Sequence, residues 1–370
     1  MSDRLHVGTR KGLFTYSRRA GRWSVERVGF LGDTVGLVHC DGRDHMLYAS
    51  LELGHFGNKL RRSPDQGATF EDCGVPEYPP KPEGLVDLNP MQQKPIEWKL
   101  DKIWSLQSGN ADQPGALWAG TIPGGLFVSN NHGTSWQIVS TLWNHPSRQK
   151  WFGGGAEKPG IHSVLVDPGN SRRITIGVSC GGVWHSDDGG ETFRVTGNGI
   201  RAEYMPPEQA LDPEIQDPHQ VVQCRARPEC FWVQHHNGIF KSTDGGASWQ
   251  EIKDVKPSVF GFAVAVHPRD PDTAWFIPAV KDEKRYPFDG KVVVTRTRDG
   301  GKSFEILTKG LPQEHAYDLV YRHGLDIDAI GQRLVFGSTT GALFVSENQG
   351  DSWECLSSHL PPIYCVRFAV

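Results

Sequence analysis

Short apolar runs, broken by tight glycine-rich turns, recur along the whole chain. Typical pairs of such runs are LWAGTIPGGLFVS (117–129), ITIGVSCGGVWHS (174–186) and LVFGSTTGALFVS (334–346). Each pair reads as two β-strands joined by a short turn. A further run precedes each pair, as in IHSVLVDP (161–168), and another follows it, as in SWQEIKD (248–254). The pattern therefore predicts units of four short strands.

An eight-residue box ends on an aromatic residue and separates the third strand of a unit from the fourth. It reads STDGGASW at 242–249 and returns as SPDQGATF (63–70), SNNHGTSW (129–136), SDDGGETF (186–193), TRDGGKSF (297–304) and SENQGDSW (346–353). A motif that returns at an interval of this size is typical of propellers and solenoids. The strand pair LHVGTRKGLFTYS (5–17) with the degenerate box SRRAGRW (17–23) adds a seventh unit.

Seven units of four strands predict an all-β fold, a seven-bladed β-propeller with Asp-box turns. The first unit lacks an opening strand, and IYCVRFAV (363–370) is an opening strand with nothing after it. We expect this C-terminal strand to pair with the N-terminal blade and close the ring. The expected single domain spans 1–370, with blades at about 1–30 plus 361–370, 31–75, 100–142, 160–197, 218–255, 257–310 and 313–360.

The boxes themselves look structural. Their Asp accepts hydrogen bonds from turn amides, their Gly adopts a positive φ, and the final aromatic side chain packs between strands. Asn replaces the Asp at positions 131 and 348. A catalytic acid would need the carboxyl group, so the replacement argues against catalysis at the boxes.

The boxes resemble the Asp-box or BNR repeats of sialidases, sortilin-type receptors, xyloglucan-specific glucanases and photosystem assembly factors. The resemblance covers essentially the whole chain and implies the propeller fold, with a glycosyl-hydrolase-like member as the expected kind of protein. It carries over no catalytic residue. The Arg-Ile-Pro motif of true sialidases is missing, and seven blades differ from their six.

Net charge and composition limit the kinds of partner that we expect for the chain. The formal net charge is −4 with both signs mixed, so the chain has no footprint for nucleic acid. No long apolar run predicts a membrane span, and we find no secretory signal. The seven Cys contain no Cys-x-x-Cys pair, which favours reduced thiols. We therefore expect a cytoplasmic protein that binds neither nucleic acid nor membrane.

The long connections predict where a site lies. Segments 76–102, 142–160, 197–218 and 280–290 all belong to the face opposite the boxes, where a regular scaffold can carry a site. Aligning the openings of the inner strands gives one column at the channel mouth: Val35, Trp104, His162, His219, Phe260, Tyr317 and Tyr364. We expect a pocket there for a small polar molecule or a carbohydrate, with Arg10, Trp104, Phe260, His235 and Arg285 as ligand-binding residues.

Three kinds of chemistry fit this mouth. The first is a metal site built from His55, His162, His219 and His315, with Asp217 or Glu314 adding a carboxylate. Imidazole suits a divalent ion such as zinc, manganese or iron. An ion with an open position would assist a hydrolase or a lyase.

The second is glycoside hydrolysis, with Glu157 and Glu214 as acid and base, or Tyr317 or Tyr364 as a nucleophile. The third is a platform without turnover that binds a protein partner at the aromatic mouth. Metal analysis and a panel of glycosides would separate the three, and the sequence leaves all of them open.

Overall fold

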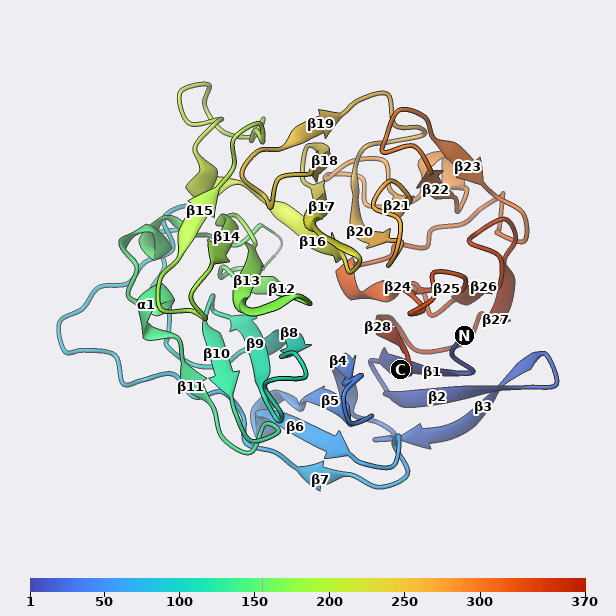
Figure 1. Cartoon of the computed structure of the whole chain (residues 1–370), viewed down its shortest axis with the longest axis horizontal. Helices are drawn as coiled ribbons and strands as arrows, with labels where there is room; N and C mark the ends of the chain where they lie inside the picture. Colours follow the sequence, from blue (N-terminus) through green and yellow to red (C-terminus); the bar gives the residue numbers. More distant parts are fainter. Residues whose placement is uncertain (155) are drawn as a thin grey trace.

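The computed structural model describes residues 1–154 and 156–370, whose strands form seven four-stranded antiparallel sheets around a central channel (Figure 1). This confirms the predicted seven-bladed propeller. The N-terminal half is built from the sheets β4 (Thr34–Cys40), β5 (Leu47–Glu52), β6 (Asn58–Ser63), β7 (Glu71–Asp72); β8 (Lys102–Ser108), β9 (Leu117–Ile122), β10 (Leu126–Ser129), β11 (Gln137–Ile138); and β12 (Ile161–Asp167), β13 (Asn170–Val178), β14 (Gly182–Ser186), β15 (Arg194–Thr196).

Three further blades complete the chain before its last strand. They are β16 (Pro218–Cys224), β17 (Arg227–His235), β18 (Gly238–Ser242), β19 (Gln250–Ile252); β20 (Gly261–Val266), β21 (Ala274–Pro278), β22 (Val294–Thr297), β23 (Glu305–Leu307); and β24 (Leu325–Ile327), β25 (Leu334–Gly337), β26 (Leu343–Ser346), β27 (Glu354–Ser357). The inner and middle strands of the blades are almost continuously buried, because each sheet is covered on both faces by its neighbours.

The ring closes through the two ends of the chain. The C-terminal strand β28 (Ile363–Phe368) pairs antiparallel with β1 (Arg4–Thr9), which continues into β2 (Gly12–Arg19) and β3 (Arg22–Gly29). Val7 lies opposite Val366, and both side chains are fully buried. The two chain ends therefore meet in one blade (Figure 1), as the sequence predicts, and the sheet has no open inner edge there.

The box turns are held by their own side chains. In the box at 242–249, Asp244 accepts hydrogen bonds from the amide of Ser248 (3.0 Å) and from the hydroxyl of Ser242 (2.8 Å). In the box at 129–136, Oδ1 of Asn131 accepts the equivalent bonds from Ser135 and Ser129, both at 2.9 Å. The side-chain oxygen is thus the essential feature, and the boxes are architectural.

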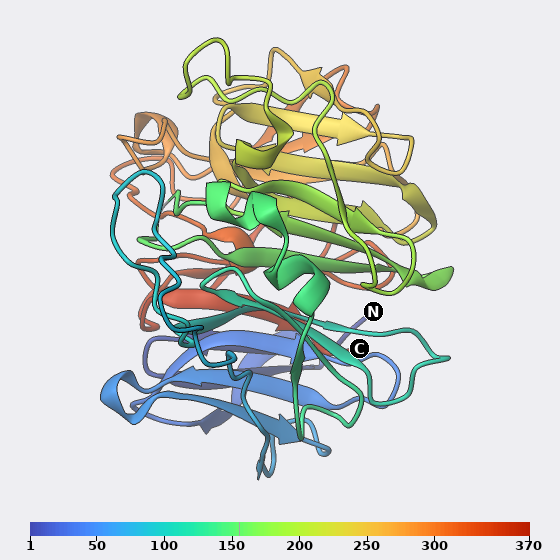
Figure 2. The same ribbon diagram turned by 90° about the vertical axis from the view of Figure 1, so that its left-hand side faces the viewer.

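The longest loop lies on the face opposite the boxes. Figure 2 shows the blue-green loop of residues 76–100 on the side away from the two chain ends, which share the box face. Short helices fill the other connections: η1 (Gly54–Phe56), α1 (Ser140–Trp143), η2 (Pro146–Lys150), η3 (Pro213–Ile215), η4 (Phe288–Gly290) and η5 (Arg322–Gly324). Among the described residues, no helix has the length and apolar character to cross a membrane.

The inner strands open with a break in their pairing. In five of them a single residue is skipped in the register with the next strand, and three of these residues are Trp104, His162 and His219. Gly36, Phe262 and Tyr364 lie within the same kind of break in β4, β20 and β28. A bulged residue is released from the ladder and its side chain is re-aimed, here at the channel mouth.

The predicted column needs three corrections. The bulge positions are Gly36 and Phe262, where the alignment placed Val35 and Phe260. In the last blade β24 begins at Leu325, not at Tyr317, because the turn η5 takes the place of the opening residues of the strand. Tyr317 is 61% exposed, and Arg322 and His323 stand at the mouth instead.

Candidate functional site at the channel mouth

A cavity of about 350 Å³ opens at the channel mouth opposite the boxes. This is within the range of small-molecule pockets, about 300–1,000 Å³. Bulge residues from five blades form its wall, and the bases of the long loops form its rim. The lining residues are Gly36, Lys102, Trp104, Ile122, Gly154, Ala156, His219, Phe262, Arg285, Tyr321, Arg322, His323 and Tyr364.

His219, on the cavity wall, belongs to a group of three side chains whose possible ligand atoms converge. They are Asp217, His219 and His236, whose oxygen and nitrogen atoms all lie within 4.8 Å of one another. Oδ2 of Asp217 is 3.5 Å from Nε2 of His219 and 3.4 Å from Nδ1 of His236. These are long for hydrogen bonds, but they match the edge of a coordination tetrahedron, about 3.4 Å for bonds of about 2.1 Å.

Hydrogen bonds behind the cluster orient it. Nδ1 of His219 lies 2.6 Å from the carbonyl oxygen of Gly261, which can only accept, so this ring nitrogen carries the proton. Oδ1 of Asp217 accepts from the amide of Cys180 at 3.2 Å. Nε2 of His219 and Oδ2 of Asp217 are then two acceptors that face each other. A cation between them resolves the conflict, and such outer contacts are typical of metal-ligating histidines.

Burial and charge set the protonation of the cluster. Burial raises the pKa of Asp217, but the two histidines and Arg322 outweigh it and hold the pKa well below its usual value. Burial lowers the pKa of His219 despite the opposing effect of Asp217, which favours the neutral ring. For His236 the effect of Asp217 outweighs burial, and the pKa is raised. An ionised carboxylate beside a neutral imidazole is the state that binds a metal.

The backbone at Gly154 packs closely against the carboxylate. A Cβ atom on Gly154 would lie 2.7 Å from Oδ2 of Asp217 and 3.0 Å from Sγ of Cys180. Only a glycine therefore fits over the cluster at this point. Three protein ligands are also the number found in catalytic zinc and non-haem iron centres. The residues present could hold a metal ion.

The structure brings together only part of the predicted metal set. His219 belongs to the cluster, and so does Asp217, which the sequence offered as an added carboxylate. His162 is fully buried one blade away, with Nδ1 bonded to Ser163 and no partner for Nε2. His55 and His315 are exposed, on η1 and on the loop before β24. His236 completes the group, and its place in the turn after β17, beside a mouth strand, was the only sequence signal for it.

The predicted acid and base do not meet in the cavity. Glu157 is exposed and lies 3.9 Å from Nζ of Lys94. Glu214 is held on η3 by hydrogen bonds to Ser147 and Lys150. Of the two tyrosines proposed as nucleophiles, Tyr364 lines the cavity with Lys102 over its ring, and Tyr317 does not. No Asp or Glu side chain is among the residues described as lining this cavity.

The predicted ligand-binding residues divide in a similar way. Trp104 and Arg285 line the cavity. Phe260 packs behind it, edge-on to His219 at 5.6 Å between ring centroids. His235 lies deeper, with Nε2 3.1 Å from the amide nitrogen of Asp217, so it supports the cluster from behind. Arg10 is exposed outside the lining.

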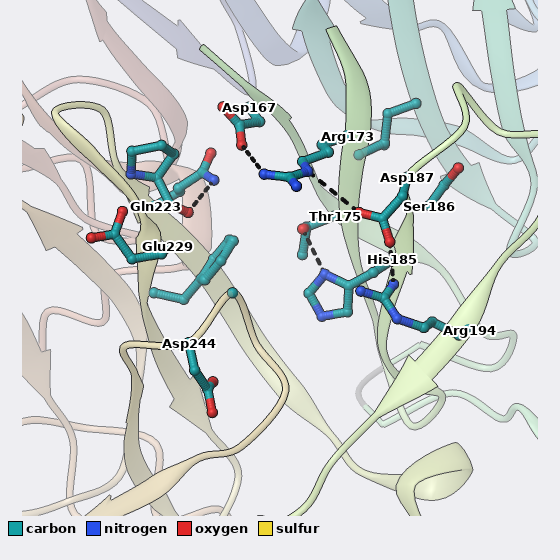
Figure 3. Close-up of a pocket in the computed structure, with 14 residues that line it drawn as sticks. Asp167, Arg173, Thr175, His185, Ser186, Asp187, Arg194, Gln223, Glu229 and Asp244 are labelled. Carbon is teal, nitrogen blue, oxygen red and sulfur yellow. Dashed lines mark hydrogen bonds and ion pairs between the residues drawn. The ribbon is translucent and has the colours of Figure 1, made fainter. Parts of the chain in front are cut away.

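Two other hollows differ in character. One lies on the box face between β12–β15 and β16–β19 (Figure 3), where Arg173 and Arg194 both reach Asp187 and Arg173 also reaches Asp167. These ion pairs are half exposed and satisfy one another, so the hollow presents little free binding capacity. The other is the box-side end of the channel, about 280 Å³, and His323 lines both it and the mouth cavity.

Comparisons with known proteins agree with the fold. No protein-family profile matches the sequence. No curated protein sequence matches it significantly either. Among solved structures, the chain is similar to the GH74 xyloglucanase of Xanthomonas campestris, with a TM-score of 0.63 and 18% identity over 98% of this chain and 52% of that one. The chain thus spans about half the length of the xyloglucanase.

Two further solved structures match over nearly their whole length. The periplasmic gluconolactonase PpgL of Pseudomonas aeruginosa has a TM-score of 0.60 and 12% identity, with 99% of both chains covered. A putative 6-phosphogluconolactonase of Bacteroides uniformis has a TM-score of 0.57 and 11% identity, again with 99% of both chains covered. At these identities the likeness shows the fold, a seven-bladed propeller, and nothing finer.

Proposed function

We propose that this propeller is a metal-dependent hydrolase acting on a small polar molecule of about the size of one sugar ring. The observation that carries the proposal is the convergence of Asp217, His219 and His236, of which His219 lines the cavity at the mouth. Hydrolysis of carbohydrate-derived bonds by this kind of fold is supported by its structural neighbours, which include a xyloglucanase and a gluconolactonase.

A divalent ion held by this group would polarise a bound carbonyl or ether oxygen and lower the pKa of a coordinated water. The chain's own residues supply the rest. Trp104 and Tyr364 present aromatic rings on which a sugar ring can stack. Gly154 lets the backbone approach the carboxylate of Asp217, and the carbonyl of Gly261 fixes the tautomer of His219.

Glycoside hydrolysis by two carboxylates has less support than the metal-dependent mechanism. Inverting and retaining glycosidases need two carboxyl groups across the scissile bond, at separations of about 5–9 Å. Glu157 and Glu214 are instead engaged with lysines on separate loops. A polar ligand at the mouth remains part of the proposal, and its hydrolysis is assigned to the metal site.

Elemental analysis of the purified protein tests the proposal. We expect about one divalent ion per chain in the wild type and in the matched control His55→Ala, whose ring is exposed, and loss of that ion in His219→Ala and His236→Ala. Turnover is then measured on a panel of sugar lactones and aryl glycosides, before and after chelation.

Hydrolysis that stops on chelation and returns on adding the ion would support the proposal. A wild type without any bound metal, or hydrolysis that is unaffected by chelation, would overturn it. If no lactone or glycoside is hydrolysed and the protein captures a protein partner, the function as a binding platform would be favoured instead.

A further inference from the structure

A buried arginine without an acidic partner stands in the same cavity. Arg322 is 8% exposed, and its Nε has no hydrogen-bond partner. Its guanidinium makes no direct ion pair or hydrogen bond among the residues that the structure describes, and the carboxylate of Asp217 acts on it only through the longer-range field. Burying such a charge unpaired is costly, and proteins usually satisfy it with a carboxylate or a bound anion.

Aromatic rings hold the guanidinium in place. Its Cζ lies 4.8 Å from the ring centroid of Trp104 and 5.4 Å from that of Phe262. Rings fix the plane of the group, but they accept none of its five N–H donors in a strong hydrogen bond. The donors of Arg322 are thus positioned at the cavity and left free.

The rest of the cavity adds positive charge. Arg285 also lies over Phe262, with 5.4 Å from its Cζ to the ring centroid, although Asp282 partly neutralises it. Lys102 reaches the cavity while paired with Glu52 at 2.8 Å. His162 and His323 each bury an Nε2 without a partner close to this arginine in the channel. The cavity therefore offers donors and cations, and acidic groups are missing from its described lining.

We propose that Arg322 is the anchor for an oxyanion, a carboxylate or a phosphate group, carried by the small molecule that binds at the mouth. The planar fork of arginine binds two oxygens of such a group side by side, which a lysine cannot do. Burial lowers the pKa of Arg322 to about 10, so the side chain still carries its charge at neutral pH.

An anion-binding Arg322 would define the substrate class of the proposed hydrolase, and this part of the inference rests on the proposed function. Phe262 links the two parts, because its ring stacks on His219 at 4.5 Å between centroids and also contacts Arg322. A molecule that places its oxyanion on Arg322 lies against the wall that carries the metal cluster. The substrate class is then a sugar acid or a sugar phosphate, rather than a neutral sugar.

The test measures binding to chelated, metal-free protein, so that a failure of the metal proposal does not affect it. The probes are glucuronate, glucose 6-phosphate and neutral glucose, titrated by calorimetry at low salt. We expect one of the two anions to bind at least tenfold more tightly than glucose, and the better one shows which oxyanion fits. Equal binding of all three, or no binding of either anion, would overturn the anchor.

Two substitutions test whether the preference for an anion comes from Arg322. Arg322→Met keeps the aliphatic volume and removes the charge, and we expect it to abolish the preference for the anion. Arg322→Lys keeps the charge without the fork, and we expect about a tenfold loss of anion affinity. Anion binding at wild-type strength in Arg322→Met would contradict the proposal.

If Arg322→Met does not fold, the titrations of Arg322→Lys and of the wild type still test whether Arg322 binds the anion. Thermal unfolding of the metal-free wild type and of metal-free Arg322→Met gives a second readout of anion binding. The midpoint of the wild type should rise with the preferred anion, and that of the variant should not.

Discussion

Nδ1 of His219 donates its proton to the carbonyl oxygen of Gly261 at 2.6 Å, which leaves Nε2 as a lone pair directed at Asp217. We therefore predict that Asp217→Asn, which keeps the size of the side chain and removes its charge, lowers metal affinity at least about 100-fold. Competition with a coloured chelator measures the affinity. Asp282→Asn, which removes a carboxylate from the rim, is the control, and equal affinities in the two variants would exclude Asp217 as a ligand.

Gly154 gives a second test of the same site without touching a ligand. In Gly154→Ala the new Cβ would lie 2.7 Å from Oδ2 of Asp217, so we expect loss of metal binding and of hydrolysis with the stability of the blades unchanged. Gly169→Ala is a matched control, because its Cβ would meet only an oxygen of Asp167 at 3.4 Å on the box face. Metal binding in Gly154→Ala at the wild-type level would show that the ion sits elsewhere.

The box turns should tolerate loss of the negative charge of their Asp, but not loss of its side-chain oxygen as a hydrogen-bond acceptor. We predict that Asp244→Asn costs less than about 0.5 kcal/mol of unfolding free energy, because Asn131 already makes the same bonds. Asp244→Ala leaves the amide of Ser248 and the hydroxyl of Ser242 without their acceptor and should cost about 1–2 kcal/mol. Urea denaturation measures both, and similar costs for the two variants would mean that the charge itself holds the turn.

A buried histidine should make the fold sensitive to acid. His185 lies between Thr175 and Thr196, each at 2.9 Å, and burial lowers its pKa to about 3. The unfolded chain takes up this proton near pH 6.5 and the folded chain does not, so stability is complete above pH 6.5 and is lost as the pH falls towards 3.

We therefore expect the contribution of His185 to fall by about 2–3 kcal/mol between pH 7 and pH 4.5. His185→Gln should show a smaller loss over that interval in urea denaturation, and His55→Gln, which changes an exposed ring, should behave like the wild type. An identical pH dependence in all three proteins would contradict the assignment.

The repeat pattern was enough to predict the fold, because each blade carries its own signal. The box, the glycine turn and the alternating strands recur unit by unit, and the closure of the ring follows from the unpaired opening strand at 363–370. The candidate site was only partly predictable because its residues carry no repeated signal. Its residues occupy irregular positions, where the pairing of the inner strand breaks and a repeat alignment loses its register.

Individual residues show this limit. Trp104 and His219 were found because the bulge falls at the same place in their strands. Arg322 was missed because η5 replaces the opening of β24, and the tyrosine at 317 was aligned in its place. His55 and His315 were expected at the axis since they belong to mouth-side loops, but the loops carry both rings out to solvent.

The bulges also separate the site from the scaffold. A residue such as Trp104, His219 or Tyr364 is skipped in the pairing of its strand, so exchanging its side chain breaks no rung of the sheet. Pocket chemistry and blade stability can therefore be varied as independent quantities. For protein engineering, the ring supplies a set of interchangeable positions, one from most blades, at which new ligand specificity can be built on an unaltered frame.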